Sequence, residues 1–275
     1  MLEQIFHSWQ LIVCDDGTAG FDPVALELQI RERLSEGCSA RIISHPQNMG
    51  TVRNLNIALR EATGQWVMLL TADDVLAEAR TLEKLSAVVS DTAKPWIVSR
   101  TELCDEALHR TGKFSLADIE SLPGKTAVVL NEKLCMRCIL PSAGNLHRRV
   151  LLEELGGFDE AYRLVEDWPT FLKQIRFGVT PEFCAEVSVL HHGGVSWSSA
   201  VRNRTYQWDL IETMRREILP HLEKLPEKDC FSIRRRCEDK AAIYELRFER
   251  RGFWSRLKWI FQHGGVIARK MIEWT

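Results

Sequence analysis

The stretch that decides the fold is Gln10-Leu11-Ile12-Val13-Cys14-Asp15-Asp16-Gly17-Thr18, an apolar run that stops at two adjacent aspartates. A second run of the same kind follows later, Trp66-Val67-Met68-Leu69-Leu70-Thr71-Ala72-Asp73-Asp74. Continuous apolar runs are typical of strands buried on both faces, as in parallel sheets. Ligands of open α/β sheets bind beyond the carboxyl ends of the strands. We therefore expect both aspartate pairs at one sheet edge, where carboxylates suit a divalent cation and the phosphates it carries.

Strand and helix patterns alternate around these two runs. We expect a helix from residue 23 to residue 37, a strand over residues 41–45, a helix that ends at Gly64 and a strand over residues 66–70. Short links between alternating strands and helices imply right-handed crossovers and a parallel sheet. Asn48 and Gly50, which follow the second strand, then fall at the same edge as the aspartates. Residues 1–9 are predicted to form the end of a helix.

The rest of the chain continues this alternation and then becomes helical. Helices are expected over residues 79–90 and 148–155, strands over residues 96–103 and 182–190, and a variable loop over residues 104–124. Glu166 and Asp167 open a further helix, and the last strand ends at His191-His192. From about residue 200 the pattern is helical to the end.

The composition limits the functional classes. The 275 residues are 45% hydrophobic and 27% charged, which is ordinary for a globular protein, and the formal net charge of −2 argues against a nucleic-acid partner. The cysteines include one isolated C-x-x-C pair, Cys135 and Cys138, without a second pair at zinc spacing, so we expect reduced thiols in a cytoplasmic protein. No signal-peptide pattern opens the chain, and no apolar stretch is long enough to span a bilayer.

Five motifs occur in a fixed order along the first two thirds of the chain. They are Cys14-Asp15-Asp16-Gly17-Thr18, residues 48–54, residues 64–74, Gly156-Gly157-Phe158-Asp159-Glu160 and Glu166-Asp167-Trp168. Together they resemble family-2 glycosyltransferases of the GT-A fold. The resemblance implies an α/β fold with a mostly parallel, Rossmann-like sheet flanked by helices. It implies a catalytic domain over residues 1–198 and a helical C-terminal extension over residues 199–275, as is common in enzymes that build bacterial surface polysaccharides.

The resemblance also implies a role for each polar cluster. Asp15 and Asp16 would contact the base and ribose of a nucleotide sugar, and the donor site would be completed by Asn48, Arg53, Asn54 and Asp74. Asp73 would bind Mg²⁺ or Mn²⁺ on the donor diphosphate, and His191 or His192 would complete the metal or phosphate site. Asp167 would be the catalytic base.

The chain departs from the family pattern in two places. Thr71 stands where the first aspartate of the family's D-x-D element usually lies. Met1 falls inside the family's first helix, so the opening strand of the family is missing from this sequence. Either the start is truncated or another segment takes the place of that central strand.

The chemistry of glycosyl transfer agrees with these roles. The leaving diphosphate of a nucleotide sugar develops negative charge, which a hard divalent cation neutralises, and carboxylate oxygens such as those of Asp73 suit that cation. The acceptor hydroxyl needs a base within hydrogen-bond reach. A single in-line displacement inverts the anomeric centre, so one carboxylate such as Asp167 suffices.

Each cluster also has a purely structural interpretation. Asp15 and Asp16 would suit a turn, Asp73 and Asp74 would cap a helix, and Glu166 and Asp167 would form an acidic pair in a first helical turn. Arg53 would be a solvated helix residue, and the two histidines a packed or solvated pair. The ordered set of motifs favours the functional interpretation for the aspartates, and both interpretations stay open for the histidines.

The leading hypothesis is an inverting glycosyltransferase that moves a sugar from a nucleotide-sugar donor to a hydroxyl of a glycan or lipid-linked acceptor. The alternative is a catalytically inactive GT-A domain that acts as a scaffold in polysaccharide assembly. A nucleotidyltransferase would show a glycine-rich phosphate loop near its N-terminus, which is not visible here. Residues 253–274 combine apolar residues at helical spacing with basic residues. This segment either lies peripherally on the inner face of a membrane or packs on the catalytic domain or a second subunit.

Overall fold

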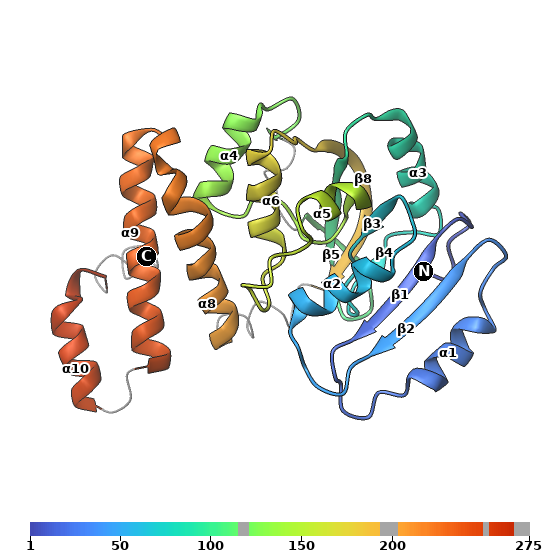
Figure 1. The fold of residues 1–275 in the computed structure, drawn as a ribbon, viewed down its shortest axis with the longest axis horizontal. Helices are drawn as coiled ribbons and strands as arrows, with labels where there is room; N and C mark the ends of the chain where they lie inside the picture. Colours follow the sequence, from blue (N-terminus) through green and yellow to red (C-terminus); the bar gives the residue numbers. More distant parts are fainter. Residues whose placement is uncertain (115–120, 193–202, 250–252, 267–275) are drawn as a thin grey trace. The chain divides into compact units, whose positions relative to one another are not determined.

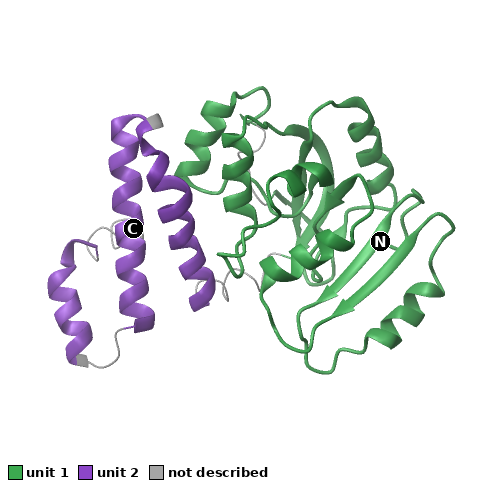
Figure 2. Cartoon of the chain, viewed as in Figure 1, with its two compact units in different colours: residues 1–198 green, residues 199–275 purple. Residues whose placement is uncertain are grey.

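The computed structural model describes residues 1–114, 121–192, 203–249 and 253–266. The chain forms two compact units, residues 1–198 and residues 199–275 (Figure 2). All of the candidate site residues named above belong to the first unit. Within the described ranges, no helix is both long enough and apolar enough to cross a membrane.

The first unit alternates short strands with helices. Its elements are β1 (Gln10–Asp15), α1 (Pro23–Arg31), β2 (Ser39–Ser44), α2 (Thr51–Glu61), β3 (Trp66–Met68), β4 (Val75–Leu76), α3 (Thr81–Asp91), β5 (Trp96–Cys104), β6 (Arg110–Phe114), α4 (Ala127–Met136), β7 (Asn145–Arg148), α5 (Arg149–Glu154), α6 (Asp167–Arg176) and β8 (Glu182–His192).

The first two strands form a parallel pair. β1 and β2 make a two-stranded sheet in which Asp15, at the end of β1, lies opposite Ser44 at the end of β2. The connecting helix α1 begins at Pro23, whose fixed φ suits the first helical turn, and Asp22 caps it by accepting hydrogen bonds from two backbone amides. The strand–helix–strand order predicted from the sequence is confirmed for this pair.

The second sheet is mixed. Its strands lie in the order β3-β7-β5-β8-β4, and β6 pairs with β5 outside this path. β5 and β8 are parallel, whereas the other pairings in this sheet are antiparallel. The predicted parallel arrangement therefore does not extend to β3, which pairs with β7 rather than with β1 among the described residues. All three residues of β3 pair with β7, and the chain then turns so that β4 pairs with β8. The two aspartate pairs therefore follow strands of different sheets rather than of the single sheet that the sequence predicted.

The apolar face of α2 shows how the sequence pattern becomes packing. Val52 and Leu59, which lie on one side of the helix, are buried in one cluster with Leu152, Phe158 and Tyr162. Helical periodicity of apolar residues predicts such a core-facing stripe. The cluster therefore fixes α2, and with it the loop that precedes α2, against the segment around residue 158.

His147 of β7 is a buried polar residue in the same unit. Its ring stacks on Trp96 with centroids 5.7 Å apart, and its Nδ1 accepts a hydrogen bond from Gln174 Nε2 at 2.9 Å. Because burial disfavours the charged imidazole, the pKa of His147 falls to about 3. His147 is therefore a neutral core residue.

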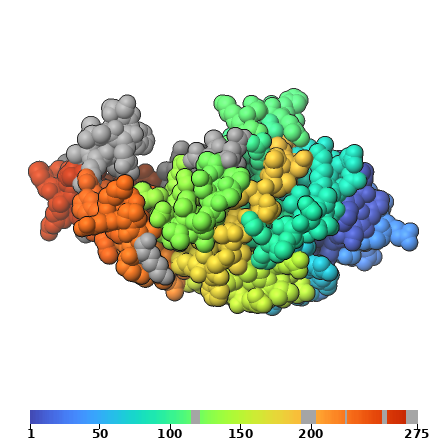
Figure 3. All heavy atoms as spheres, turned by 90° about the horizontal axis from the view of Figure 1, so that it is seen from above, coloured from blue at the N-terminus to red at the C-terminus, as the bar shows by residue number. Residues whose placement is uncertain are grey.

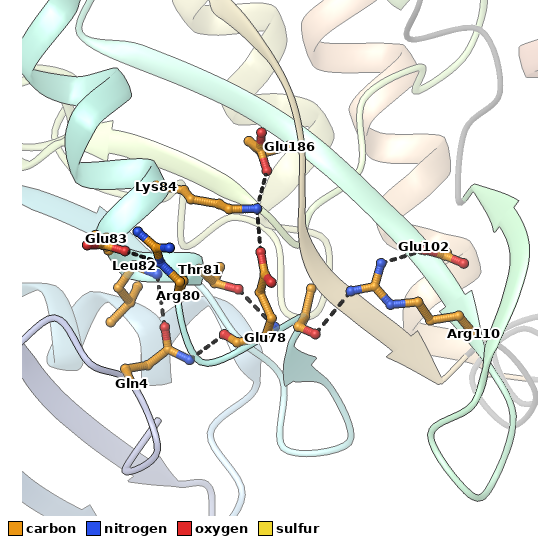
Figure 4. A network of polar contacts seen from close by, with 11 residues as sticks. Gln4, Glu78, Arg80, Thr81, Leu82, Glu83, Lys84, Glu102, Arg110 and Glu186 are labelled. Atoms are coloured by element: carbon orange, nitrogen blue, oxygen red, sulfur yellow. Dashed lines mark hydrogen bonds and ion pairs between the residues drawn. The ribbon is translucent and has the colours of Figure 1, made fainter.

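Residues 1–9 are not helical, so the helix predicted there is wrong. Gln4 holds this segment instead, because its Nε2 donates to the carbonyl of Glu78 at 2.7 Å and its Oε1 accepts from the amide of Leu82 at 2.9 Å (Figure 4). A short segment gains little from helix formation alone. Hydrogen bonds to a distant part of the chain therefore decide its conformation.

Further polar contacts fix the segment that follows Asp73 and Asp74. Lys84 Nζ lies 2.5 Å from Glu78 and 2.9 Å from Glu186, and Arg110 donates to the carbonyl of Ala77 at 3.1 Å (Figure 4). Exposed ion pairs contribute little individually. Together these contacts join α3, the β5–β6 hairpin and β8 around the short strand β4.

The strand β6 lies within residues 104–124, where the sequence predicted a variable loop. β6 pairs with β5, and this hairpin stands out from the surface in Figure 3. Residues 115–120 of the predicted loop lie outside the described residues. α4 follows and lies beside α6 (Figure 1); its buried residues are Leu130, Leu134 and Cys135.

The second unit is mainly helical where the structure describes it, as the sequence pattern predicted. It contains α8 (Arg204–Thr213), the π-helical turn η2 (Met214–Ile218), the 3-10 helix η3 (Leu219–Lys224), α9 (Glu227–Tyr244), the π-helical turn η4 (Glu245–Glu249) and α10 (Phe253–Gln262). Residues 267–274 of the predicted amphipathic tail lie outside the described ranges.

Candidate active site

Asp15 closes the turn that follows β1. Its carboxylate accepts hydrogen bonds from the amides of Gly17 and Thr18, both at 3.2 Å, and from Ser44 Oγ at 3.1 Å. The hydrogen bonds, led by that from the Thr18 side chain, hold the pKa of Asp15 below its usual value. Gly17 has φ 79°, and a Cβ there would lie 2.6 Å from the backbone of Gln47, so this turn requires glycine.

Asp16 ties the loop after β1 to the loop after β2. Its Oδ1 accepts from the amide of Met49 at 2.7 Å, and its Oδ2 accepts from the amide of Gly50 at 2.9 Å. A carboxylate that receives two backbone amides is held in one orientation. The structure thus brings the first aspartate pair and the Asn48–Gly50 loop together, as parallel strands ending at one edge predict.

Arg163 is a residue of this region to which the sequence assigned no role. Its Nη2 donates to Asn48 Oδ1 at 2.8 Å and to the Asn48 carbonyl at 2.9 Å, and its own carbonyl accepts from the amide of Val52 at 3.2 Å. Gly50, with φ 96°, approaches so closely that a Cβ would lie 2.4 Å from Arg163 Cγ. A lone arginine in a loop gives no sequence signal; only the fold shows that it joins the β2–α2 loop to the segment before Glu166.

The other two residues predicted on the donor side lie on α2. Asn54 Nδ2 donates to the carbonyl of Cys14 at 2.8 Å, while its Oδ1 is buried without a hydrogen-bond partner among the described residues. Arg53 Nε lies 3.4 Å from Glu160 Oε2, and the two side chains are 60% and 47% exposed. An ion pair this exposed is weak. The guanidinium of Arg53 can therefore exchange Glu160 for another anionic partner at little energetic cost.

Asp74 and His191 form a buried pair at the junction of β4 and β8. His191 Nδ1 lies 2.7 Å from Asp74 Oδ1, which also accepts from the amide of His192 at 3.3 Å, and only 1% of the Asp74 side chain is exposed. Burial opposes the charged carboxylate, but the hydrogen bonds from His191 and Thr71 outweigh it, so the pKa of Asp74 is lowered. The bond to Asp74 in turn raises the pKa of His191.

The protonation of this pair follows from its geometry. An ionised carboxylate can only accept hydrogen bonds, so His191 Nδ1 carries the proton that points to Asp74. The Nε2 atom of His191 is then the ring nitrogen left for another partner. Thr71, which replaces the usual first aspartate of the D-x-D element, contributes its hydroxyl to Asp74.

Asp73 is exposed, in contrast to Asp74. Its charge contributes, after the larger effect of Asp74, to the raised pKa of His191. No group of three or more His, Cys, Asp and Glu side chains in the described ranges is arranged to hold a metal ion. Mg²⁺ is commonly bound by one or two carboxylates together with water and substrate phosphates. The residues present therefore fit a cation shared with a substrate rather than one enclosed by protein ligands.

Glu166 and Asp167 open α6, as predicted from the sequence. Asp167 Oδ1 accepts from the amide of Trp168 at 2.6 Å. Burial raises the pKa of both carboxyls, and for Glu166 the neighbouring charge of Asp167 adds to the shift. Burial, with the charge of Asp167, also raises the pKa of Cys138. The C-x-x-C motif thus contains a protonated thiol, and all eight cysteines are free.

The predicted residues therefore lie in three groups. The first holds Asp15, Asp16, Asn48, Arg53 and Asn54 at the ends of β1 and β2. The second holds Asp73, Asp74, His191 and His192 at the start of β4 and the end of β8. The third is Glu166 and Asp167 at the start of α6, and Arg163 connects the first group to the segment that precedes the third.

The family model described as "Glycosyl transferase family 2" matches residues 1–138, which is half of the 275 residues. The chain belongs to glycosyl transferase family 2. The match ends before Glu166, so the first group and Asp73–Asp74 lie inside it, whereas Asp167 and the histidines lie beyond it.

Two curated relatives of this family-2 chain are named as a rhamnosyltransferase and a glycosyltransferase. The O-antigen chain rhamnosyltransferase RfbN of Salmonella typhimurium is 27% identical over 201 residues, which are 69% of this chain and 59% of that protein. The PGL/p-HBAD biosynthesis glycosyltransferase of Mycobacterium bovis is 24% identical over 166 residues, which are 60% of this chain and 57% of that protein. The chain thus spans less than two thirds of the length of either relative.

Two solved structures share its fold. TarS 1–349 of S. aureus in complex with UDP has a TM-score of 0.55 at 13% identity, covering 90% of this chain and 75% of that one. The mannosyltransferase PcManGT from Pyrobaculum calidifontis, in complex with GDP-Man and Mn²⁺, has a TM-score of 0.53 at 17% identity, covering 97% of this chain and 68% of that one. At such identities the likeness concerns the fold alone, and the family-2 chain has the GT-A fold that its motifs implied.

Proposed function

We propose that this chain is an inverting glycosyltransferase that moves a sugar from a nucleotide-sugar donor to a hydroxyl of a glycan or lipid-linked acceptor. The observation that carries the proposal is the pairing of buried Asp74 with His191 beside the exposed carboxylate of Asp73. Because Asp73 is exposed beside this buried pair, a ligand can reach its carboxylate. Membership of the family, and relatives named as glycosyltransferases, support the same activity.

Asp73 is the residue that would hold a divalent cation, with the imidazole of His191 or His192 beside it. When bound, Mg²⁺ or Mn²⁺ would neutralise the charge that develops on the leaving diphosphate. Asp74 would affect the cation site indirectly, through His191. Its hydrogen bond fixes which ring nitrogen of His191 is protonated and how the ring is oriented. The charge on Asp74 is therefore used for positioning.

The donor's base and ribose are proposed to bind at the carboxyl ends of β1 and β2. Asp16 holds the two loops together through the amides of Met49 and Gly50. Asp15, Asn48 and Asn54 keep the donor-binding roles proposed from the motifs, whereas buried Asp74 is proposed to act on the donor side only through His191. Arg53 can exchange its exposed partner Glu160 for a phosphate, because the ion pair between them is weak.

Asp167 is proposed as the base that removes the proton from the acceptor hydroxyl. Burial raises its pKa, and a carboxylate with a raised pKa is a stronger base near neutral pH. Its hydrogen bond with the amide of Trp168 holds one oxygen at the start of α6. The other oxygen is the one proposed to accept the proton.

The second unit supplies an argument for contact with a membrane surface. On α10, Trp254 and Phe261 are 78% and 82% exposed, and the helix contains Arg256 and Lys258 but no acidic residue. Exposed aromatic residues with basic neighbours suit the interface of an anionic bilayer. We propose a peripheral location on the cytoplasmic face, which would bring the chain to a lipid-linked acceptor.

A catalytically inactive scaffold remains the second candidate, because Thr71 occupies the position of a metal-binding aspartate and bonds Asp74 instead. An activity assay with a panel of nucleotide sugars distinguishes an active enzyme from an inactive scaffold. An enzyme should hydrolyse or transfer from at least one donor, with the rate dependent on Mn²⁺ or Mg²⁺. A chain that binds nucleoside diphosphates but releases no sugar from any donor, with acceptor present, would favour the scaffold.

A further inference from the structure

A cavity of about 190 Å³ opens in the second unit, which contains none of the residues assigned to glycosyl transfer. It is lined by the cationic side chains of Arg236, Lys240 and Arg247 and by the rings of Tyr244 and Phe248. Among the residues that the structure describes, none of those lining the cavity is acidic. The cavity thus combines positive charge with an aromatic wall.

The helix geometry places these cations on one face. Arg236, Lys240 and Tyr244 are spaced by four residues along α9, so they are neighbours on the helix surface. Arg236 and Lys240 are like charges at this spacing, which disfavours the helix. Arg247 and Phe248 lie on the π-helical turn η4, and such turns are rare and frequently found at functional sites.

The aromatic wall is held in place by neighbouring side chains. The ring of Tyr244 lies 5.3 Å from that of Trp208 and 5.1 Å from that of Phe248. Arg204 Nε donates to the Tyr244 hydroxyl at 3.0 Å, and Arg204 also pairs with Glu249 at 4.0 Å. The exposed Arg204–Glu249 pair is weak, but the hydrogen bond from Arg204 and the ring contacts hold Tyr244 in place before any ligand arrives.

We propose that this cavity binds the phosphate group of an organic phosphate, with Arg236, Lys240 and Arg247 around the anion and the apolar part of the ligand against Phe248. Guanidinium groups recognise phosphate through paired hydrogen bonds. Pockets that enclose a whole drug-sized ligand have volumes of about 300–1,000 Å³. A cavity of about 190 Å³ therefore takes a phosphorylated head group rather than an entire molecule.

Calorimetry on the full chain tests the site with two probes, inorganic pyrophosphate and dihexanoyl phosphatidic acid. A chelator is present throughout, so that a metal-dependent donor site in the first unit contributes nothing. The R236Q variant should bind both probes about tenfold more weakly or worse, the effect of losing one charge-assisted hydrogen bond. R235Q, which changes an exposed arginine of the same helix outside the cavity lining, should bind as the native chain does.

The comparison of probes identifies the source of the phosphate. Equal affinities would point to a free phosphate group, and tighter binding of the lipid would point to a lipid head group whose acyl part contacts Phe248. R236K should recover part of the affinity, because it keeps the charge, and it replaces R236Q if that variant does not fold. Absence of binding of both probes by the native chain, or equal losses in R236Q and R235Q, would overturn the proposal.

Discussion

His191 Nδ1 lies 2.7 Å from Asp74 Oδ1, although the two residues are 117 positions apart in the sequence. The contact joins β4 to the end of β8 and leaves Asp73 exposed one residue away. Two adjacent aspartates of one motif thus have different tasks. Asp74 holds the local structure, and Asp73 is open to a ligand.

Asp74→Asn should therefore reduce stability. The amide keeps the shape but loses the charge that His191 and Thr71 stabilise, and hydrogen bonds to a charged group contribute about 1.5–3 kcal/mol. Asp73→Asn is the control, and it should change the free energy of unfolding little because Asp73 is exposed. Urea unfolding of both variants and of the native chain at neutral pH measures the loss of stability. An equal loss in both variants would show that the division of tasks is wrong.

Asp73→Asn should instead weaken metal-dependent nucleotide binding, because the amide lacks the charge that a divalent cation needs. Titration calorimetry with a nucleoside diphosphate, with and without Mn²⁺, measures the effect. Asp91→Asn is the matched control, since Asp91 is an exposed aspartate at the end of α3. If Asp73→Asn keeps the native affinity and metal dependence, Asp73 does not belong to the site.

The buried His147 predicts a specific dependence of stability on pH. Its pKa is about 3 in the fold against the usual 6.5, so between these values the unfolded state binds a proton that the folded state does not. The unfolding free energy should therefore be highest above pH 6.5 and fall as the pH drops toward 3, by at most about 1.4 kcal/mol per pH unit. In His147→Phe, which retains an aromatic ring beside Trp96, this slope should be smaller. Identical slopes in both proteins would exclude His147 as the cause.

The exposed aromatic residues of α10 predict binding to anionic vesicles. The double variant Trp254→Ser, Phe261→Ser should co-sediment less with phosphatidylserine vesicles, because it removes the apolar contacts and leaves only the basic residues, each contributing about 1 kcal/mol near the surface. Phe231→Ser is the matched control, since Phe231 is 66% exposed on α9. If the native chain does not bind these vesicles at low salt, the membrane proposal is wrong and α10 serves in packing or in a subunit contact.

The sequence predicted those elements whose signal is local. The apolar run before Asp15 and the helical spacing of Val52 and Leu59 correspond to β1 and α2, and the Asp16–Gly50 contact follows from two strands that end at the same edge. These elements depend on side-chain periodicity and on short connections, which the sequence displays directly.

The sequence could not predict features that depend on distant pairing. The burial of Asp74 rather than Asp73 follows from the pairing of β4, a strand of two residues, with β8. Residues 1–9 are held by Gln4 and not by helical hydrogen bonds. Arg163 acquires its role only because the fold brings Asn48 to it. In each case the deciding partner lies more than seventy residues away.

The most direct test of the central claim is the rate of sugar transfer by Asp167→Asn. Asparagine is isosteric with aspartate and keeps an acceptor oxygen for the amide of Trp168, but it cannot take the acceptor's proton. The variant should fold and bind the nucleotide sugar as the native chain does, while transfer falls by about 10²–10⁴-fold; Glu166→Gln should lose less. Near-native transfer by a folded Asp167→Asn would contradict the account.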